Sequence, residues 1–196
     1  QEPEAAAVLT TRCTELDITP AREGVEFAVT SRSLAVGGQM LTIQGIGGEY
    51  DELYLPLHGE HQSANAALAL AAVELFFNVN PERKLDIDVV RAGFAAVTSP
   101  GRLERLRTSP TVFIDSAHNP HGARAITTAL AESFDFSRLV GVVAVLEGKD
   151  ARGILTALEP GFDSIVVTRN SSPRSMSVDD IAQIALDIYG DDRVFA

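Results

Sequence analysis

Residues 139–146 read LVGVVAVL, an apolar run that is broken only by Gly141. A strand without polar positions predicts a parallel sheet that is covered on both faces. Strand-like and helix-like segments alternate around this run, with strands at 111–115 and 164–168 and helices at 122–133, 151–158 and 178–189. The second half of the chain is therefore predicted to be an α/β domain, a Rossmann-like βαβαβα unit with a mainly parallel sheet.

The first half of the chain has a different pattern. Three short strand-like runs, at 26–30, 40–43 and 52–57, are separated by glycine pairs that favour tight turns, and together they predict a β-meander. Residues 60–77 form a long Ala/Leu segment without Gly or Pro, which predicts a helix. Its apolar residues cover nearly every side, so we expect this helix to be buried.

A second helix is predicted at 87–97, and the sequence Ser99-Pro100-Gly101 then interrupts regular structure. We place a domain boundary there, which gives one domain over residues 1–98 and another over 99–196. Residues 193–195 resemble the start of a further strand.

The composition excludes several classes of protein. Hydrophobic residues at 45% and charged residues at 22% are typical of a globular protein and not of a disordered one. The net charge of −11 disfavours binding to nucleic acid or to an anionic membrane surface. The single cysteine, Cys13, allows no intrachain disulfide, and neither a secretory signal nor a membrane-spanning run is visible. We therefore expect a cytoplasmic protein.

The sequence DSAHNPHG at 115–122 follows a predicted strand directly, and ligands of parallel α/β sheets collect at the carboxyl ends of strands. Asp115 could accept hydrogen bonds from sugar hydroxyls, while His118 and the first N–H groups of the next helix could face an anion. Alternatively, Asp115 and Asn119 only satisfy donors of the turn and of the helix start. Both interpretations are open.

Three arginines gather between residues 100 and 107, next to the predicted domain boundary of an acidic chain. A guanidinium group donates two parallel hydrogen bonds and so suits a phosphate. Arg102, which follows Gly101, is the strongest candidate. The alternative is that the arginines of this linker are simply solvated.

His61 and Asn65 are four residues apart and share one face of the predicted helix, a stripe that continues through Ala69, Ala72 and Phe76. The side-chain amide of Asn65 offers both a donor and an acceptor, which recognition of a purine edge requires. A buried asparagine that holds a neighbouring loop would explain the same pattern.

Two His-x-x-His pairs, His58/His61 and His118/His121, are compatible with a metal site, although no cysteine supports one. A phosphate-binding P-loop sequence is absent from the chain. The sequence Gly45-Ile46-Gly47-Gly48 begins like a dinucleotide-binding motif but opens no helix, so we reject it.

Three segments in this order, GEHQSANAALA at 59–69, SPGRLE at 99–104 and DSAHNPHGA at 115–123, resemble the folylpolyglutamate synthase/dihydrofolate synthase family of the Mur-ligase superfamily. The resemblance implies the later part of an ATP-binding domain, followed by the Rossmann-like carboxyl-terminal domain. It also implies an ATP-dependent amide ligase. In that family ATP phosphorylates the carboxylate of dihydropteroate or of a folate, and the amine of L-glutamate attacks the acyl phosphate.

Carried over to this sequence, the resemblance assigns Asn65 to the adenine, Arg102 to the phosphates and Asp115 to the ribose of ATP. It makes His118 an essential catalytic neighbour in the same motif. Two residues depart from the family pattern, since Ser116 and Gly148 stand where glycine and aspartate are usual. Lys149 could serve the glutamate site or could be a solvated loop residue.

The resemblance places the P-loop and the Mg²⁺ ligands before Gln1, so the chain is expected to be a fragment that is inactive by itself. The expected partners are ATP, L-glutamate and a folate or dihydropteroate, and the expected state is a monomer. Two alternatives remain open, a non-catalytic nucleotide-binding module and a metal-binding domain built on the four histidines. The sequence leaves open whether the first glutamate, later ones or both are added.

Overall fold

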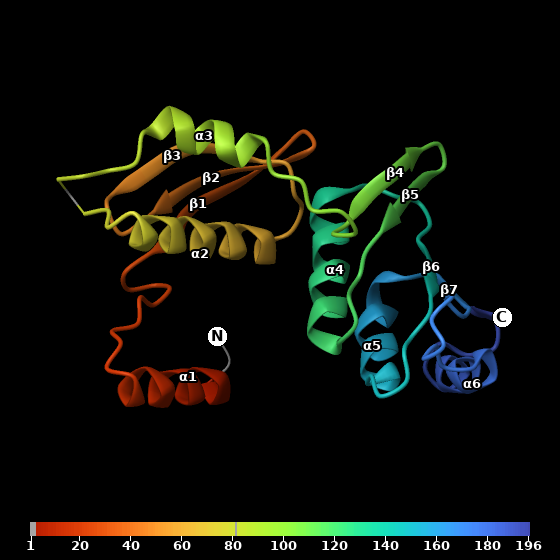
Figure 1. Cartoon of the computed structure of the whole chain (residues 1–196). Coiled ribbons are helices and arrows are strands. Elements are labelled where there is room, and N and C mark those ends of the chain that lie inside the picture. The colour runs from red at the N-terminus through yellow and green to blue at the C-terminus, as the bar shows by residue number, and fades with distance from the viewer. Residues whose placement is uncertain (1–2, 81) are drawn as a thin grey trace. The chain divides into compact units, whose positions relative to one another are not determined.

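In the computed structural model, which describes residues 3–80 and 82–196, the chain divides into two compact units (Figure 1). Unit 1 consists of Gln1–Pro56 and Ser63–Ala96, and unit 2 consists of Leu57–Gln62 and Val97–Ala196. Among the described residues, no helix is long and apolar enough to cross a membrane.

Unit 1 contains the predicted β-meander. Strands β1 (Ala28–Ala35), β2 (Gly38–Gln44) and β3 (Glu49–Leu55) form an antiparallel sheet in this order. The first strand extends five residues beyond its predicted end, because its polar residues occupy the exposed positions of an edge strand. Alternate positions of β2 are buried, and its Leu41 and Ile43 contribute to the core together with Leu53 and Leu55 of β3.

Three helices complete unit 1. They are α1 (Pro3–Glu15), α2 (Glu60–Phe76) and α3 (Ile87–Ala95). Helix α3 begins at the cap Asp86, whose side chain accepts hydrogen bonds from the N–H groups of Asp88 and Val89.

The expectation that α2 is buried on nearly every side is wrong for the part of the chain that the structure describes. Its buried residues form one stripe, which contains Ser63, Ala67, Leu70, Ala71 and Glu74. On the opposite side, Leu68 is 54% exposed and Phe76 is 79% exposed. The sequence places apolar residues on nearly every side of the helix, but only one side meets the core of unit 1.

The glycine-rich loop that resembled a dinucleotide-binding motif encloses a carboxylate of the same unit. The Glu74 side chain, which is 0% exposed, accepts hydrogen bonds from the N–H groups of Ile46 at 2.7 Å and Gly47 at 2.9 Å. The Tyr50 hydroxyl donates to the same carboxylate at 2.9 Å. Burial and, after it, the hydrogen bond to Glu74 together raise the pKa of Tyr50 to about 12. The loop is therefore an internal anchor for α2.

Unit 2 contains the predicted α/β alternation. Its elements are β4 (Glu104–Thr108), β5 (Thr111–Ile114), α4 (Pro120–Ser133), β6 (Val140–Val143), α5 (Ala151–Leu158), the 3₁₀ turn η1 (Glu159–Gly161), β7 (Ser164–Val167), α6 (Val178–Tyr189) and β8 (Val194–Phe195). Strands β6, β7 and β8 form a parallel sheet, as predicted, and β8 is the further strand expected at residues 193–195. The expectation that this sheet is covered on both faces is wrong for the described residues, because Val140 and Val142 on one face of β6 are 44% and 69% exposed.

One strand of unit 2 pairs differently from the prediction. Strand β5 forms an antiparallel hairpin with β4 and is not hydrogen-bonded to the described parallel sheet. Strand β4 was missed because its sequence ERLRT is mostly polar and exposed, so it has the composition of a linker.

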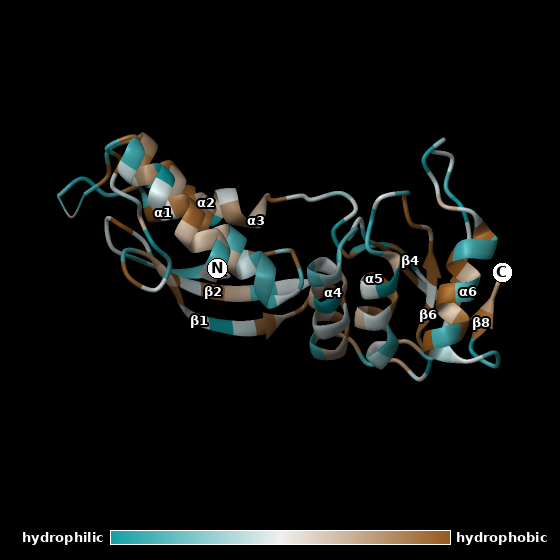
Figure 2. Ribbon diagram, turned by 90° about the horizontal axis from the view of Figure 1, so that it is seen from below, coloured by the Kyte–Doolittle hydropathy of each residue, from teal (hydrophilic) through white to brown (hydrophobic). Residues whose placement is uncertain are grey.

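The core of unit 2 lies between the parallel sheet and its helices, where Leu155, Ile165 and Ile181 are 0% exposed. Helix α6 is amphipathic, and Figure 2 shows both hydrophobic and hydrophilic positions along it. It begins at the predicted cap, because Ser177 Oγ accepts a hydrogen bond from the N–H of Asp180 at 3.1 Å.

Candidate functional site

Arg102 and Asp115 lie in two turns that are joined by hydrogen bonds. Asp115 Oδ2 accepts a hydrogen bond from the N–H of Leu103 at 2.7 Å, and Asp115 Oδ1 accepts one from the N–H of Ala117 at 2.7 Å. The N–H of Ser116 donates to the carbonyl of Gly101 at 2.9 Å. The structural interpretation of Asp115 is therefore confirmed, since its carboxylate closes both turns.

This structural role leaves room for a ligand. An ionised carboxylate offers about four acceptor positions, and the two backbone N–H groups use two of them. The Asp115 side chain is only partly buried, so the remaining positions can accept hydrogen bonds from hydroxyl groups.

The turn that carries Arg102 is conformationally unusual. Gly101 has φ of +70° and Leu103 has φ of +46°, a left-handed conformation that costs free energy for a leucine. The Leu103 side chain is 7% exposed and packs with Ala129 and Leu130 of α4, which holds the residue in place. Arg102, between two anchored neighbours, keeps an exposed side chain. A fixed backbone and a free guanidinium suit the capture of an anion.

His118 is oriented by the backbone of the same motif. Its Nδ1 lies 3.1 Å from the carbonyl oxygen of Ser116. A carbonyl oxygen can only accept a hydrogen bond, so Nδ1 carries the proton and the neutral ring keeps Nε2 as its acceptor. The imidazole is exposed, and Nε2 is thus available to a ligand.

The first turns of α4 and α5 lie side by side. A Cβ atom added to Gly153, near the start of α5, would approach Pro120 Cγ at the start of α4 to 2.7 Å. Asn119 caps α4 by accepting a hydrogen bond from Gly122 N–H at 2.8 Å, and Asp150 caps α5 by accepting one from Gly153 N–H at 2.8 Å. Asn119 therefore has the structural role that was considered for it.

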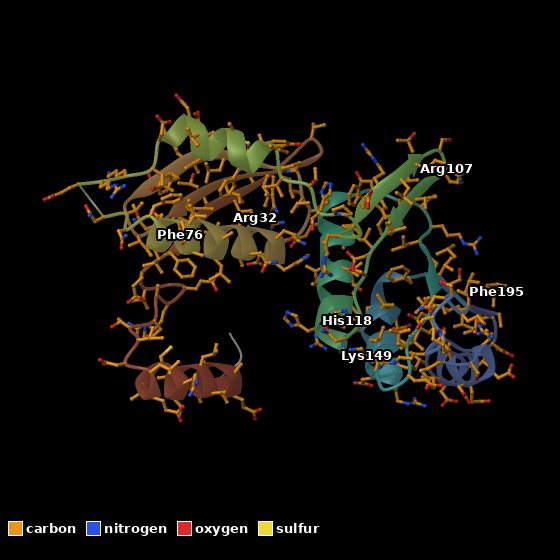
Figure 3. The ribbon with its side chains drawn as sticks, viewed as in Figure 1. Arg32, Phe76, Arg107, His118, Lys149 and Phe195 are labelled. Atoms are coloured by element: carbon orange, nitrogen blue, oxygen red, sulfur yellow. The ribbon has the colours of Figure 1, made fainter. Side chains whose placement is uncertain are left out.

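His118 and Lys149 come from the loops that lead into these two helices, and Figure 3 shows them where α4 and α5 begin. Lys149 is exposed, as expected under both interpretations of its role. Gly148 adopts φ of +80°, a conformation that glycine favours, and this accounts for glycine in place of the aspartate usual in the family pattern.

The sequence did not draw attention to a second loop at the carboxyl edge of the parallel sheet, the edge at which the loop with Lys149 also lies. Residues 168–177 connect β7 to α6, and their backbone pairs with the loop after β6. The N–H of Glu147 donates to the carbonyl of Arg174 at 2.8 Å, and that of Met176 donates to the carbonyl of Val145 at 2.9 Å. Arg174 is thereby held beside the loop that contains Lys149. Asp115 was selected because it follows a strand that was predicted to be parallel. The same rule would have selected this loop, which follows the parallel strand β7.

Asn65 lies on α2 in unit 1 and is exposed. The alternative required a buried asparagine, and the exposure of Asn65 contradicts that burial. Arg102, Asp115 and His118 share unit 2, whereas the contact of Asn65 with the same nucleotide stays a prediction.

The four histidines do not form the metal site considered from the sequence. In the described part of the chain, no group of three or more His, Cys, Asp or Glu side chains could hold a metal ion. The His58 ring packs against Phe134 with a centroid distance of 4.7 Å. Burial lowers the pKa of His58, and the nearby charge of Arg105 lowers it further, so this side chain is a packing residue.

The chain is similar in sequence to known proteins. Residues 101–195 match the family model of the Mur ligase glutamate ligase domain. The chain is 59% identical over 194 residues to the dihydrofolate synthase/folylpolyglutamate synthase of Mycobacterium tuberculosis, covering 99% of this chain and 40% of that protein. It is 31% identical over 176 residues to the folylpolyglutamate synthase of Lacticaseibacillus casei, covering 89% of this chain and 40% of that protein.

Solved structures show the same relationship. The chain superposes on Mycobacterium tuberculosis folylpolyglutamate synthase complexed with ADP and AMPPCP with a TM-score of 0.96 and 58% identity, covering 100% of this chain and 43% of that one. The chain thus spans about two fifths of the length of the relatives that it matches. Its fold, its motifs and these similarities show that it belongs to the folylpolyglutamate synthase/dihydrofolate synthase family of Mur ligases.

Proposed function

We propose that this chain is part of an ATP-dependent ligase that joins L-glutamate to a folate or to dihydropteroate, as a folylpolyglutamate synthase, a dihydrofolate synthase or both. The observation that carries the proposal is the joined pair of turns, in which the Asp115 carboxylate fixes the backbone next to an exposed Arg102. Relatives named for these two activities support it.

In this proposal residues 1–98 are the later part of the ATP-binding domain, and residues 99–196 are the glutamate ligase domain. The match of the glutamate ligase family model to residues 101–195 supports the second assignment. The chain passes from unit 1 to unit 2 between Ala96 and Val97, close to the proposed boundary, while the short segment Leu57–Gln62 groups with unit 2.

The nucleotide is ATP, whose phosphates Arg102 binds through its guanidinium group. Asp115 accepts hydrogen bonds from the ribose hydroxyls with the acceptor positions that the turns leave free, and Asn65 contacts the adenine. Related folylpolyglutamate synthases that were solved in complex with ADP or AMPPCP support a nucleotide of this kind. Mg²⁺ is assigned in this proposal to the phosphates and to the part of the ligase outside this chain, as the family resemblance implies.

His118 acts on the incoming amine. Formation of the amide bond requires the amine of L-glutamate to lose a proton as it attacks the acyl phosphate, from which inorganic phosphate leaves. Nε2 of neutral His118 is the proton acceptor in this proposal, and the carbonyl of Ser116 holds the ring in the required tautomer.

The carboxylates of L-glutamate are bound by cations at the same edge of the sheet. Lys149 and Arg174 lie on loops that are paired through their backbones, and both side chains are exposed. We assign them to this substrate because a dianion needs positive charge in an otherwise acidic protein.

The working state is proposed to be a cytoplasmic monomer. The single cysteine, which permits no intrachain disulfide, supports a reducing compartment. Sedimentation velocity of the purified ligase tests the monomer.

The experiment that tests the function uses the complete ligase that contains this chain. ADP release is measured with ATP, L-glutamate and either dihydropteroate or a reduced folate. Release that requires both L-glutamate and one of the acceptors supports the proposal, and the active acceptor identifies the activity. ADP release that is independent of L-glutamate, or nucleotide binding without turnover, contradicts it.

A further inference from the structure

The side of α2 that faces away from the core of unit 1 is an exposed apolar surface. We call it the outer face of α2 and define it by Asn65, Leu68, Ala69, Ala72, Leu75 and Phe76. Leu68 is 54% exposed, Leu75 is 55% exposed and Phe76 is 79% exposed. Figure 3 shows Phe76 at the end of this helix.

The residue spacing makes the outer face continuous. Positions 65, 69, 72 and 76 follow the i, i+4, i+7, i+11 pattern of one helix side, and the buried stripe that contains Ala67, Leu70 and Glu74 occupies the opposite side. The two alanines in the middle permit a close approach of another element, and Leu68, Leu75 and Phe76 border them. With a rise of about 1.5 Å per residue, the face is about 18 Å long.

The chemistry of the outer face is that of a core and not of a solvated surface. Asn65 is its only polar residue, and the only charged residue between positions 65 and 76 is Glu74, which is buried and bonded to the glycine-rich loop. A helix that is apolar on all sides is typical of a protein interior, and a continuous exposed apolar surface of this kind marks an interface.

We propose that the outer face of α2 packs against another part of the complete ligase, one that does not belong to this chain. This inference rests on the proposed function. The length argues for that occupant, because the chain covers only 40% of the Mycobacterium tuberculosis enzyme. The occupant presents apolar side chains to Leu68, Leu75 and Phe76.

The position of Asn65 gives the interface a second role. Asn65 stands at the amino-terminal end of the outer face, and an adenine ring needs apolar walls beside an amide that reads its edge. The element that covers the alanines and Phe76 then also completes the wall next to Asn65. Loss of that packing weakens nucleotide binding without any change in a residue that contacts the phosphates.

Cysteine labelling tests the proposal on the complete ligase and on the 196-residue chain, both with Cys13→Ala. Phe76→Cys and, separately, Leu68→Cys place a thiol on the outer face, and the matched control Val36→Cys places one in the β1–β2 turn, where the side chain is 99% exposed. We expect iodoacetamide to label both outer-face thiols at least roughly 100-fold more slowly in the complete ligase than in the chain, because a covered thiol reacts only after local opening. The control is expected to react equally fast in both.

Three results would overturn the proposal. Equal labelling of Phe76→Cys and Val36→Cys in the complete ligase shows that the outer face is free. Protection in the 196-residue chain that grows with its concentration shows that a second copy covers the face, and protection that is independent of concentration shows that a segment of the same chain covers it. ADP release of the Cys13→Ala ligase is measured in parallel, so that loss of the proposed activity is distinguished from failure of the packing proposal.

Discussion

The N–H of Leu103 donates to the carboxylate of Asp115 at 2.7 Å, and this bond joins the turn that carries Arg102 to the end of β5. A residue proposed to bind ribose therefore also fixes a residue proposed to bind phosphate. Substitutions at Asp115 are expected to affect both roles, and the size of each effect can be separated by choosing the replacement.

Asp115→Ala removes the acceptor of two backbone N–H groups, and we expect it to lower the free energy of unfolding by about 1–3 kcal/mol. Asp115→Asn keeps one acceptor oxygen and is expected to lose less. Urea denaturation of the 196-residue chain measures both. ATP affinity of the complete ligase is expected to fall in both variants, and an unchanged affinity in Asp115→Ala would remove this residue from the ribose site.

Arg102→Ala is expected to lower the turnover of the complete ligase by roughly 10²- to 10³-fold, by analogy with the removal of one preorganised donor at a transition state. The control is Arg107→Ala, since Arg107 is also exposed but its Nε donates to the carbonyl of Pro110 within the hairpin. Steady-state ADP release checks both variants. Turnover of Arg102→Ala within threefold of the wild type contradicts the phosphate role.

Glu74→Gln is expected to destabilise unit 1 by about 2–4 kcal/mol. The glutamine keeps one acceptor, but its NH₂ group then meets a backbone N–H donor at a fully buried position. Glu49→Gln is the control, because Glu49 is exposed. If urea unfolding gives the two variants equal midpoints, the buried carboxylate is not an anchor.

Tyr50 makes the stability of unit 1 sensitive to alkaline pH. Its pKa is raised from an ordinary value of 10.0 to about 12, so its contribution is complete below pH 10 and is lost as the pH rises toward 12. The expected loss is roughly 2–3 kcal/mol, from the relation of about 1.4 kcal/mol per pKa unit. In Tyr50→Phe this loss is absent, whereas Tyr54→Phe is expected to retain it. Urea midpoints between pH 9 and 12 measure the difference.

His58 gives unit 2 the opposite sensitivity, toward acid. Burial lowers the pKa of His58 below the ordinary 6.5, so the folded protein binds a proton at this ring more weakly than the unfolded chain does. The free energy of unfolding is therefore unaffected above pH 6.5 and decreases as the pH drops below that value. His58→Phe keeps the contact with Phe134 and is expected to reduce the acid sensitivity. His121→Phe, at an exposed position, is expected to leave it unchanged. Thermal unfolding between pH 5 and 8 follows the effect.

Much of the fold follows from local patterns. The glycine pairs between short strands predict the meander, and the alternation around residues 139–146 predicts the order of β5 to α6. Strand β4 could not be predicted in this way, because an exposed strand of arginine and threonine lacks an apolar side. The exposure of one side of α2 was equally hidden, since an all-apolar helix does not show which side is covered.

The residues of the candidate site were predicted from their types and their places in the sequence, whereas their orientation depends on backbone features that only the structure shows. Asp115 and His118 were selected by their place after a strand, and the structure adds the hydrogen bonds that orient them. The left-handed Leu103 that positions Arg102 could not be foreseen, because leucine rarely adopts a positive φ. Arg174 was missed because the position rule was applied only to the loop after residues 111–115, and Lys149 was considered only through the family resemblance.

The hydrogen bonds that the N–H groups of Ile46 and Gly47 donate to Glu74 connect residues 28 and 27 positions apart in the sequence. The β2–β3 hairpin therefore completes its loop only when α2 has arrived, and α2 buries its carboxylate only when that loop has closed. We therefore expect β2, β3 and α2 to open as one cooperative unit, so that their slowest amide protons report one common opening free energy in hydrogen exchange.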